Sequence, residues 1–339
     1  MLVRGSEVLI RWVGIASLCL LAACGRQGEE ELAIYSARNE QLIKPVFDKY
    51  TAETGVKVRF VTDDAAPLIE RLAAEGANSP ADILLTVDAG ELWHAAERGL
   101  LEPIDSSVLA ANIPEALRDP GNRWFGLSVR ARTIAYSTER VKPEELSTYE
   151  ALAEERWRGK LCLRTSKKVY NQSLVAMLIA QHGEEQTEQV IRGWVANLAT
   201  DVFSNDTLLM EAIAAGQCDV GIVNTYYYGR LLRDKPEVPV KLFWADQAGS
   251  GVHVNVSGAG ITTHAPHRDA AQKFLEWLSQ AESQSMFAGL NMEYPANPAV
   301  GADPIVLAWG EFKSNPINVA KAGELQATAV RLMDRAGYH

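Results

Sequence analysis

The chain has 339 residues, a formal net charge of −10 at pH 7, and 22% charged side chains. This length exceeds what one small hydrophobic core needs, so we expect two lobes. The acidic balance and the lack of a Lys/Arg-rich run disfavour a nucleic-acid partner.

The N-terminus has the pattern of a bacterial lipoprotein signal. Arg4 and Arg11 precede an apolar run over residues 12–23 that is too short to span a bilayer. Small residues stand directly before Cys24. We therefore expect residues 1–23 to be a signal peptide, acyl chains on Cys24 to be the membrane anchor, and residues 24–31 to be a polar tether. An ordinary cleaved signal with an incidental cysteine is the alternative. The expected location is the periplasm or cell envelope.

Strand-like and helix-like patterns alternate along the rest of the chain. The expected strands cover residues 32–36, 56–61, 82–87, 133–137, 160–164, 220–224 and 238–244. The expected helices cover residues 42–50, 68–74, 92–96, 172–182, 186–198, 206–215, 267–281 and 320–336. Repeated strand-then-helix order predicts an α/β fold with a doubly wound, largely parallel sheet.

Two cysteines remain once the signal and the anchor are set aside. Cys162 and Cys218 each lie in a strand-like context. In an oxidising compartment such a pair is more often bridged than free, so we expect a disulfide. Two unrelated buried thiols are the alternative. The sequence has no CxxC or HExxH motif, so a zinc site of the usual spacing is unsupported.

The expected strand at 220–224 leads into three consecutive tyrosines, Tyr226, Tyr227 and Tyr228. Open α/β sheets present ligand groups at strand ends. A phenol has a pKa near 10, and a bound cation can hold it as phenolate. A hard trivalent ion such as Fe(III) suits this donor, and a soft ion does not. The alternative is that the tyrosines form an aromatic patch in the core or at its rim. For a tyrosine triplet taken alone, this alternative is the more common one.

Polar side chains near other strand ends have two interpretations each. Arg130 and Arg132 lie on one face of a strand, which suits an anion, although a surface ion pair or a solvated rim is the alternative. We expect Asn39 to cap the following helix, while Glu40 is either a first-turn residue or an oxygen ligand. Asp88 is either a site residue or a helix cap.

Several short motifs occur in an ordered series. They are Tyr35-Ser36-Ala37-Arg38, Ser79-Pro80-Ala81-Asp82, Val87-Asp88-Ala89-Gly90-Glu91-Leu92-Trp93, Arg130-Ala131-Arg132-Thr133 with Tyr136, Tyr170-Asn171-Gln172-Ser173, and Asn224-Thr225-Tyr226-Tyr227-Tyr228. Tyr170 precedes Tyr226 by 56 residues. Together these motifs resemble the two-lobe periplasmic solute-binding proteins, and more narrowly the iron(III)-binding proteins of bacterial ABC importers.

This resemblance implies a type II two-lobe α/β fold, with a mostly parallel sheet flanked by helices in each lobe and a ligand cleft between the lobes. We expect the N-terminal lobe to contain residues 32–128 and 256–300. We expect the C-terminal lobe to contain residues 129–255 and 301–339. The crossings between lobes are expected near residues 126–132 and 250–258, where the strand pattern meets glycine.

The resemblance also implies a ligand set for Fe(III). Phenolates at Tyr170, Tyr226 and Tyr227 would bind the ion, and Tyr228 would pack. In some members a small anion such as carbonate completes the site. The matching residues here are Arg130, Arg132 and Ser166, of which the arginines suit a planar oxyanion.

The sequence departs from this family pattern in the first loop. Some relatives have His or His-Tyr where this chain has Asn39 and Glu40. The ligand from the N-terminal lobe is therefore open, with the Glu40 carboxylate as one candidate.

The function implied by the resemblance is delivery of Fe(III) to an inner-membrane ABC permease by a monomeric binding protein that is not an enzyme. The alternatives are a binding protein for another small ligand, such as an organic anion or a polyamine, and an exported enzyme. Nucleophile-elbow, metal-hydrolase and phosphate-loop motifs are absent from the sequence.

Overall fold

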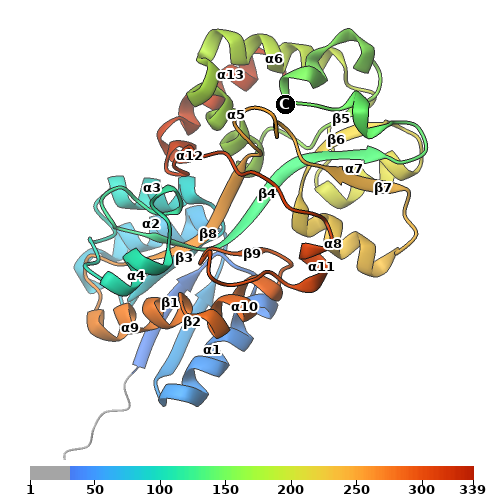
Figure 1. The fold of residues 1–339 in the computed structure, drawn as a ribbon. Helices are drawn as coiled ribbons and strands as arrows, with labels where there is room; N and C mark the ends of the chain where they lie inside the picture. The colour runs from blue at the N-terminus through green and yellow to red at the C-terminus, as the bar shows by residue number, and fades with distance from the viewer. Residues whose placement is uncertain (1–30) are drawn as a thin grey trace, which may run out of the picture.

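A computed structural model describes residues 31–339 and shows two lobes joined by the long strands β4 (Phe125–Ser137) and β8 (Val254–Ile261) (Figure 1). The expected signal peptide and the anchor at Cys24 lie outside the described residues, as does the expected tether except for its last residue. No helix within residues 31–339 combines the length and the apolar content needed to cross a membrane.

The first lobe is built on one end of the sheet. Its strands lie in the order β2 (Lys57–Thr62), β1 (Glu31–Ser36), β3 (Ile83–Thr86), β8 and the first half of β4. The short strand β9 (Tyr294–Pro295) also pairs with β4. The helices of this lobe are α1 (Glu40–Thr54), α2 (Ala65–Glu75), α3 (Ala89–Glu97), α4 (Ser107–Asn112), α9 (Arg268–Leu278) and α10 (Ala281–Gly289).

The second lobe uses the other half of β4. There β4 pairs with β6 (Val220–Asn224) and β7 (Val240–Phe243), and β5 (Leu161–Cys162) pairs with β6. The helices of this lobe are α5 (Val169–His182), α6 (Glu184–Ala196), α7 (Asp206–Ala214), α8 (Thr225–Asp234) and α13 (Gln326–Arg335). Two short α-helices lie in the last part of the chain, α11 (Pro304–Leu307) and α12 (Lys321–Glu324).

The sheet is mixed, which corrects the expectation that each lobe is mostly parallel. β1 runs parallel to β2 and β3, and β5 runs parallel to β6. Every pairing of β4 and of β8 is antiparallel. The reason is that β4 leads from the first lobe to the second and β8 leads back, so the two connecting strands run in opposite directions.

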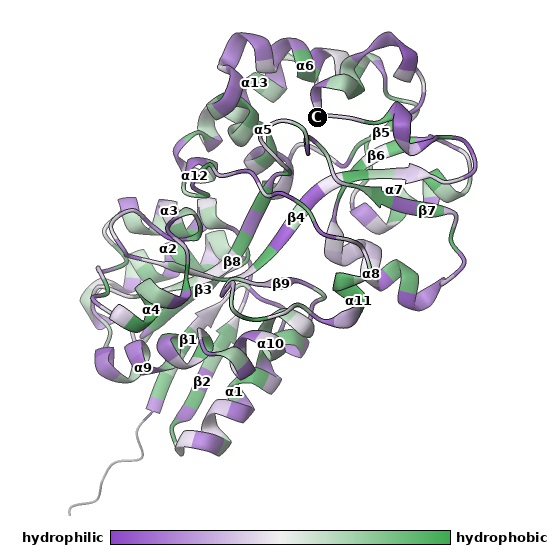
Figure 2. Ribbon diagram, in the orientation of Figure 1, coloured by the Kyte–Doolittle hydropathy of each residue, from purple (hydrophilic) through white to green (hydrophobic). Residues whose placement is uncertain are grey.

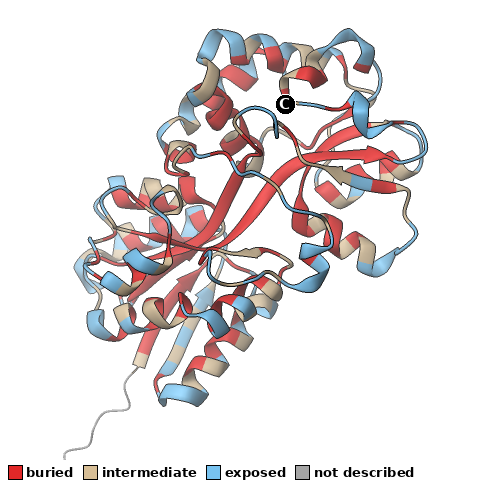
Figure 3. Ribbon diagram, viewed as in Figure 1, coloured by how far each residue is buried: buried red, intermediate tan, exposed pale blue. Residues whose placement is uncertain are grey.

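The crossing on β4 is marked by a change of partner strand. Ala131 is the last residue of β4 that pairs with β8, opposite Val254, and Arg132 is the first that pairs with β6, opposite Asn224. This point falls within the expected crossing at residues 126–132. All residues of β4 are buried, so a continuous buried strand runs through both lobes (Figure 3). Figure 2 shows that apolar and hydrophilic residues alternate along part of this strand.

The last part of the chain touches both lobes. The Asn318 side-chain amide donates to the carbonyl oxygens of Glu115 and Arg118 at 2.7 and 3.1 Å. α12 packs against α3 of the first lobe and α5 of the second. The assignment of residues 301–339 to the C-terminal lobe stays a prediction, and the segment that contains Asn318 and α12 forms a further link between the lobes.

Candidate functional site

Three tyrosines gather at the first turns of two helices in the second lobe. Tyr170 is the second residue of α5, and Tyr226 and Tyr227 are the second and third residues of α8. The ring centroids of Tyr226 and Tyr227 lie 4.4 Å apart. The hydroxyls of Tyr170 and Tyr226 share a hydrogen bond. The structure thus brings the three predicted tyrosines together, while Tyr228 packs against Trp309 in the core.

The local sequence explains how the rings reach this position. β6 ends at Asn224 and α8 begins at the next residue, so no loop separates the sheet from the tyrosines. α8 packs on the core through Tyr228 and Leu231, which are buried, while Gly229 is buried as well. All three tyrosines lie in the first turn of their helix, where the helix dipole favours negative charge.

Three guanidinium groups surround the three rings. The guanidinium carbon of Arg130 lies 5.2 Å from the centroid of the Tyr170 ring. That of Arg164 lies 5.3 and 5.6 Å from the rings of Tyr170 and Tyr227. In addition, Arg164 Nη1 donates to the Tyr227 hydroxyl at 3.4 Å. The third cation, Arg230, lies 5.1 and 5.6 Å from the rings of Tyr226 and Tyr227. Cations at this range favour the phenolate over the phenol.

Burial acts in the opposite direction on the phenols of Tyr170 and Tyr226. Burial is the largest cause that raises the pKa of Tyr226 well above its ordinary value, and the charge of Arg130 opposes it. The pKa of Tyr170 is raised for the same main reason. Without a cation the phenols of Tyr170 and Tyr226 are therefore neutral at pH 7, and a metal ion that binds them has to displace their protons.

Arg132 is not an anion-binding residue, which corrects that part of the expected site. Its side chain donates to Asn171 Oδ1 from Nε and Nη2 at 3.0 and 2.6 Å, and to the Ile222 carbonyl at 3.1 Å. Its Nη1 donates to Asp206 Oδ2 and Asn224 Oδ1 at 3.0 and 3.2 Å. These bonds use all five donors of the guanidinium group. Arg132 instead ties the start of α5 to the end of β6.

Arg130 keeps a donor free. It is 2% exposed, and its Nη2 lies 3.4 Å from Asp88 Oδ2. Its Nη1 is buried and has no hydrogen-bond partner among the described residues. Asp88 itself caps α3 by accepting from the Gly90 amide at 2.8 Å, so the cap interpretation of Asp88 is correct. Ser166 is half-buried in the loop before α5, and its role stays a prediction.

The first loop favours the capping interpretation. Asn39 Oδ1 accepts a hydrogen bond from the Gln41 amide at 3.0 Å, which confirms Asn39 as the N-cap of α1. Glu40 is exposed in the first turn of that helix. No contact within residues 31–339 joins Glu40 to the three tyrosines, so its role as a ligand stays a prediction.

Sequence reasoning missed Arg164 and Arg230. Arg230 lies one helical turn after Tyr226, a spacing that would have indicated a contact if the tyrosines had been assigned to a helix. Arg164 follows the apolar strand β5. A charged residue directly after a buried strand was the sequence signal that could have indicated a site residue. Among the described residues no group of three or more His, Cys, Asp and Glu could hold a metal ion, so the tyrosines are the candidate ligands.

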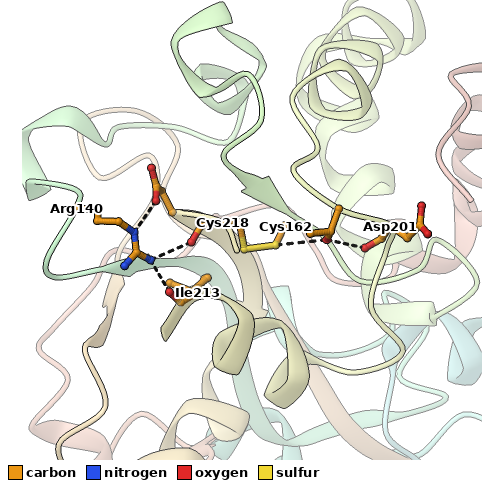
Figure 4. Close-up of a disulfide and its surroundings, with 7 residues drawn as sticks. Arg140, Cys162, Asp201, Ile213 and Cys218 are labelled. Carbon is orange, nitrogen blue, oxygen red and sulfur yellow. Dashed lines mark hydrogen bonds and ion pairs between the residues drawn. A yellow bond between two sulfur atoms is a disulfide. The ribbon is translucent and has the colours of Figure 1, made fainter. Parts of the chain in front are cut away.

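A disulfide joins Cys162 of β5 to Cys218, just before β6, with the sulfur atoms 2.04 Å apart (Figure 4). β5 and β6 are neighbouring strands, as the prediction required. Next to the bridge, Arg140 Nη2 donates to the Cys218 carbonyl at 3.1 Å, and Nε donates to Asp219 at 2.7 Å. Cys162 lies two residues before Arg164, so the bridge fixes the end of the strand that directly precedes this cation.

The fold and this site are those of a solute-binding protein of a transport system, not of an enzyme. Residues 46–314 match the family described as bacterial extracellular solute-binding protein, and the chain belongs to that family. Membership places the protein in the periplasm.

Individual relatives cover nearly the whole chain. Iron uptake protein A1 of Synechocystis sp. is 43% identical over 335 residues, which cover 94% of this chain and 93% of that protein. Iron uptake protein A2 of the same organism is 45% identical over 313 residues, which cover 90% and 89%. The structure of Trichodesmium FutA (IdiA) with iron and citrate ligands is similar at a TM-score of 0.88 and 44% identity, covering 91% of this chain and all of that one.

A further solved structure confirms the predicted fold class. Ferric iron-binding protein A of Mannheimia haemolytica, in an open conformation, is similar at a TM-score of 0.86 and 37% identity. The similarity covers 91% of this chain and 99% of that one. The type II two-lobe fold expected from the sequence is therefore the fold of this protein.

Proposed function

We propose that this protein is the substrate-binding component of an iron(III) ABC import system. It binds Fe(III) between its lobes through the phenolates of Tyr170, Tyr226 and Tyr227, and it delivers the ion to an inner-membrane permease. The observation that carries the proposal is the convergence of three phenol groups under three guanidinium groups. The iron uptake proteins and ferric-binding proteins among its relatives support it.

The donor set suits a hard trivalent cation. Three phenolates balance the charge of Fe(III), and oxygen donors match its preference. The surrounding arginines offset the cost of ionising buried phenols, because each guanidinium interacts favourably with a phenolate. A softer or less charged ion would gain less from displacing three protons.

A small oxyanion completes the proposed site. The buried Arg130 Nη1, which has no partner among the described residues, is a free donor for such an anion, and Ser166 is the proposed hydroxyl partner. Carbonate has the planar geometry that a guanidinium group binds. The donor from the N-terminal lobe is Glu40 or a water molecule.

Delivery requires the protein to stay near the permease. The proposed means is the lipid anchor on Cys24 that remains after removal of residues 1–23. Acyl chains would hold the monomeric two-lobe body at the membrane without a protein span.

A binding protein for an organic anion is the second candidate. The observation that favours it is the excess of guanidinium groups around the tyrosines, which by themselves attract an anion. A polyamine ligand has no such support, because the same cations would repel it.

Metal analysis of protein purified from an iron-replete periplasm separates these candidates. The iron proposal predicts about one iron atom per chain, from the single tyrosine site, and a visible charge-transfer band from iron-phenolate bonds. A colourless, iron-free protein that carries an organic anion would instead establish the second candidate.

A further inference from the structure

A turn of the first lobe holds the helix that carries two of the tyrosines. This turn, Leu290–Glu293, lies between α10 and β9. Asn291 Oδ1 accepts a hydrogen bond from Arg230 Nη2 on α8. Asn291 Nδ2 in turn donates to Glu293 Oε1 at 2.9 Å. Asn291 is therefore a polar bridge from α8 of the second lobe to a carboxylate of the first.

Glu293 is fixed to the framework of the first lobe. Its Oε2 lies 3.1 Å from Arg38 Nη1 and accepts a hydrogen bond from Ser128 Oγ at 2.6 Å. Arg38 follows β1, and Ser128 lies in the half of β4 that pairs with β8 and β9. Arg38 and Glu293 are both almost fully buried. The carboxylate that orients Asn291 is thus attached to two strands of the first lobe.

The turn also packs directly on α8. A Cβ atom added to Gly229 would lie 2.5 Å from Met292 Sδ and 2.8 Å from the Trp309 ring, so a larger residue would have to displace these side chains. Met292 has a φ of 55°, in the left-handed region that side chains other than glycine rarely adopt. The close approach and the unusual backbone occur at the same point, where the two lobes meet.

The far side of Arg230 faces the tyrosine rings. Its guanidinium lies 5.1 Å from the Tyr226 centroid while its Nη2 binds Asn291. We propose that the turn Leu290–Glu293 is a clasp between the lobes, and that Asn291 is a positioning residue that holds Arg230 against Tyr226 and Tyr227. The role of this clasp in transport rests on the proposed iron-binding function.

The clasp links lobe position to the charge environment of the site. When the lobes are together, Asn291 fixes Arg230 over the rings. When they separate, the hydrogen bond to Asn291 and the Gly229–Met292 contact are lost together, because one partner of each belongs to the other lobe. Opening therefore frees a cation that stabilises the phenolates, which favours release of the bound ion.

The test compares Asn291→Ala with Asn297→Ala. Asn297 is a matched control because it is buried in the same segment but donates to the Ser279 carbonyl at 3.0 Å and does not contact Arg230. We expect Asn291→Ala to release Fe(III) to a competing chelator about tenfold faster, the factor that corresponds to one charge-assisted hydrogen bond. We expect Asn297→Ala to release it at the wild-type rate. Gly229→Ala, which displaces Met292, should also accelerate release.

A double-mutant cycle and a ligand-free measurement complete the test. In the cycle, Asn291→Ala should not accelerate Fe(III) release any further when Arg230→Ala is already present, because both substitutions remove the same contact. Without added iron, Asn291→Ala should increase hydrogen exchange in α8 around Arg230 relative to Asn297→Ala, because the contact of Arg230 with Asn291 involves protein groups alone and the amides there have intrahelical partners. Additive effects in the cycle, or equal exchange in the two variants, would overturn the clasp. The hydrogen-exchange result tests the clasp even if the wild-type protein binds no iron. Failure of the wild-type protein to bind iron would reject the proposed function and not the clasp.

Discussion

Two arginines on one face of β4 have different hydrogen-bonding states. Arg132 has all its donors engaged, whereas Arg130 retains a buried donor without a partner among the described residues. The difference arises from the side chains packed above each one. Asn171, Asp206 and Asn224 converge on Arg132 from three elements, while Arg130 forms its one ion pair within residues 31–339 with Asp88. Arg132 therefore has a structural role, and Arg130 is available to a ligand.

This assignment predicts a stability effect. Replacing Arg132 with Met would leave the buried Asp206 carboxylate without its closest cation, and we expect a loss of about 3–5 kcal/mol in the free energy of unfolding. Arg192→Met is the control, because Arg192 is exposed and pairs with Glu188 on the surface of α6. Chemical denaturation of both variants measures the difference. A loss no larger than that of the control would show that Arg132 is not a structural residue.

The raised phenol pKa values predict a pH dependence of iron binding. Burial raises the pKa of Tyr170 and Tyr226, so both are protonated at neutral pH and lose a proton when Fe(III) binds. Binding that releases protons strengthens as pH rises, so the affinity should fall as pH is lowered from about 8 to about 6. Competition with a chelator of known proton release measures this. An affinity that is constant after that correction would mean that the phenols are not ionised in the complex.

At this scale the sequence predicted the tyrosines but not the cations around them. Tyr170, Tyr226 and Tyr227 could be found because family motifs carry them at a fixed spacing. Arg164 contacts Tyr227 across 63 positions of sequence, and no local pattern predicts such a contact. The free donor of Arg130 also has no local sequence signal, because it depends on which side chains from distant parts of the sequence pack against this arginine.

The elements that position the site are β6 and α8, with β5 and α5 beside them. The sequence predicted the β6 strand to its last residue, because its apolar run ends at Asn224. It did not predict α8, since three aromatic residues in a row have low helix propensity and were assigned to a strand end. Tertiary packing of Leu231 and Gly229 overrides that local preference. The observed start of α5 is also earlier than expected and includes Tyr170.

The disulfide beside these elements predicts a further stability effect. Cys162 and Cys218 are 56 positions apart, and closing a loop of this size stabilises a fold by about 4 kcal/mol. The Cys162→Ser/Cys218→Ser double variant should therefore unfold at lower denaturant concentration than the wild type. Wild-type protein treated with a reductant should behave in the same way. If reduced and oxidised proteins unfolded identically, the bridge would be absent from the protein in solution.

The whole molecule depends on the segments that pass between the lobes. The length and the family motifs predicted two lobes, and the crossing on β4 was predicted within a few residues. Strand direction could not be predicted, because hydrophobic periodicity is the same for parallel and antiparallel strands. The link through residues 315–323 was missed as well, since Asn318 acts through backbone carbonyls that carry no sequence signal.

A two-lobe body with its ligand groups at the junction suits reversible capture. The tyrosines belong to one lobe, and Asn291 and Asp88 approach their arginines from the other. A ligand that bridges such groups stabilises the closed arrangement over the open one. Delivery then needs only opening, with no chemical step.

The most direct test of the central claim is a titration of Fe(III) into wild-type protein and into the Tyr226→Phe/Tyr227→Phe double variant, followed by visible absorption. Tyr228→Phe is the matched control because it changes the neighbouring packed ring. The account predicts a charge-transfer band that saturates at one equivalent in the wild type and in the control, and that is largely lost in the double variant. A double variant that keeps the band and the affinity would contradict the account.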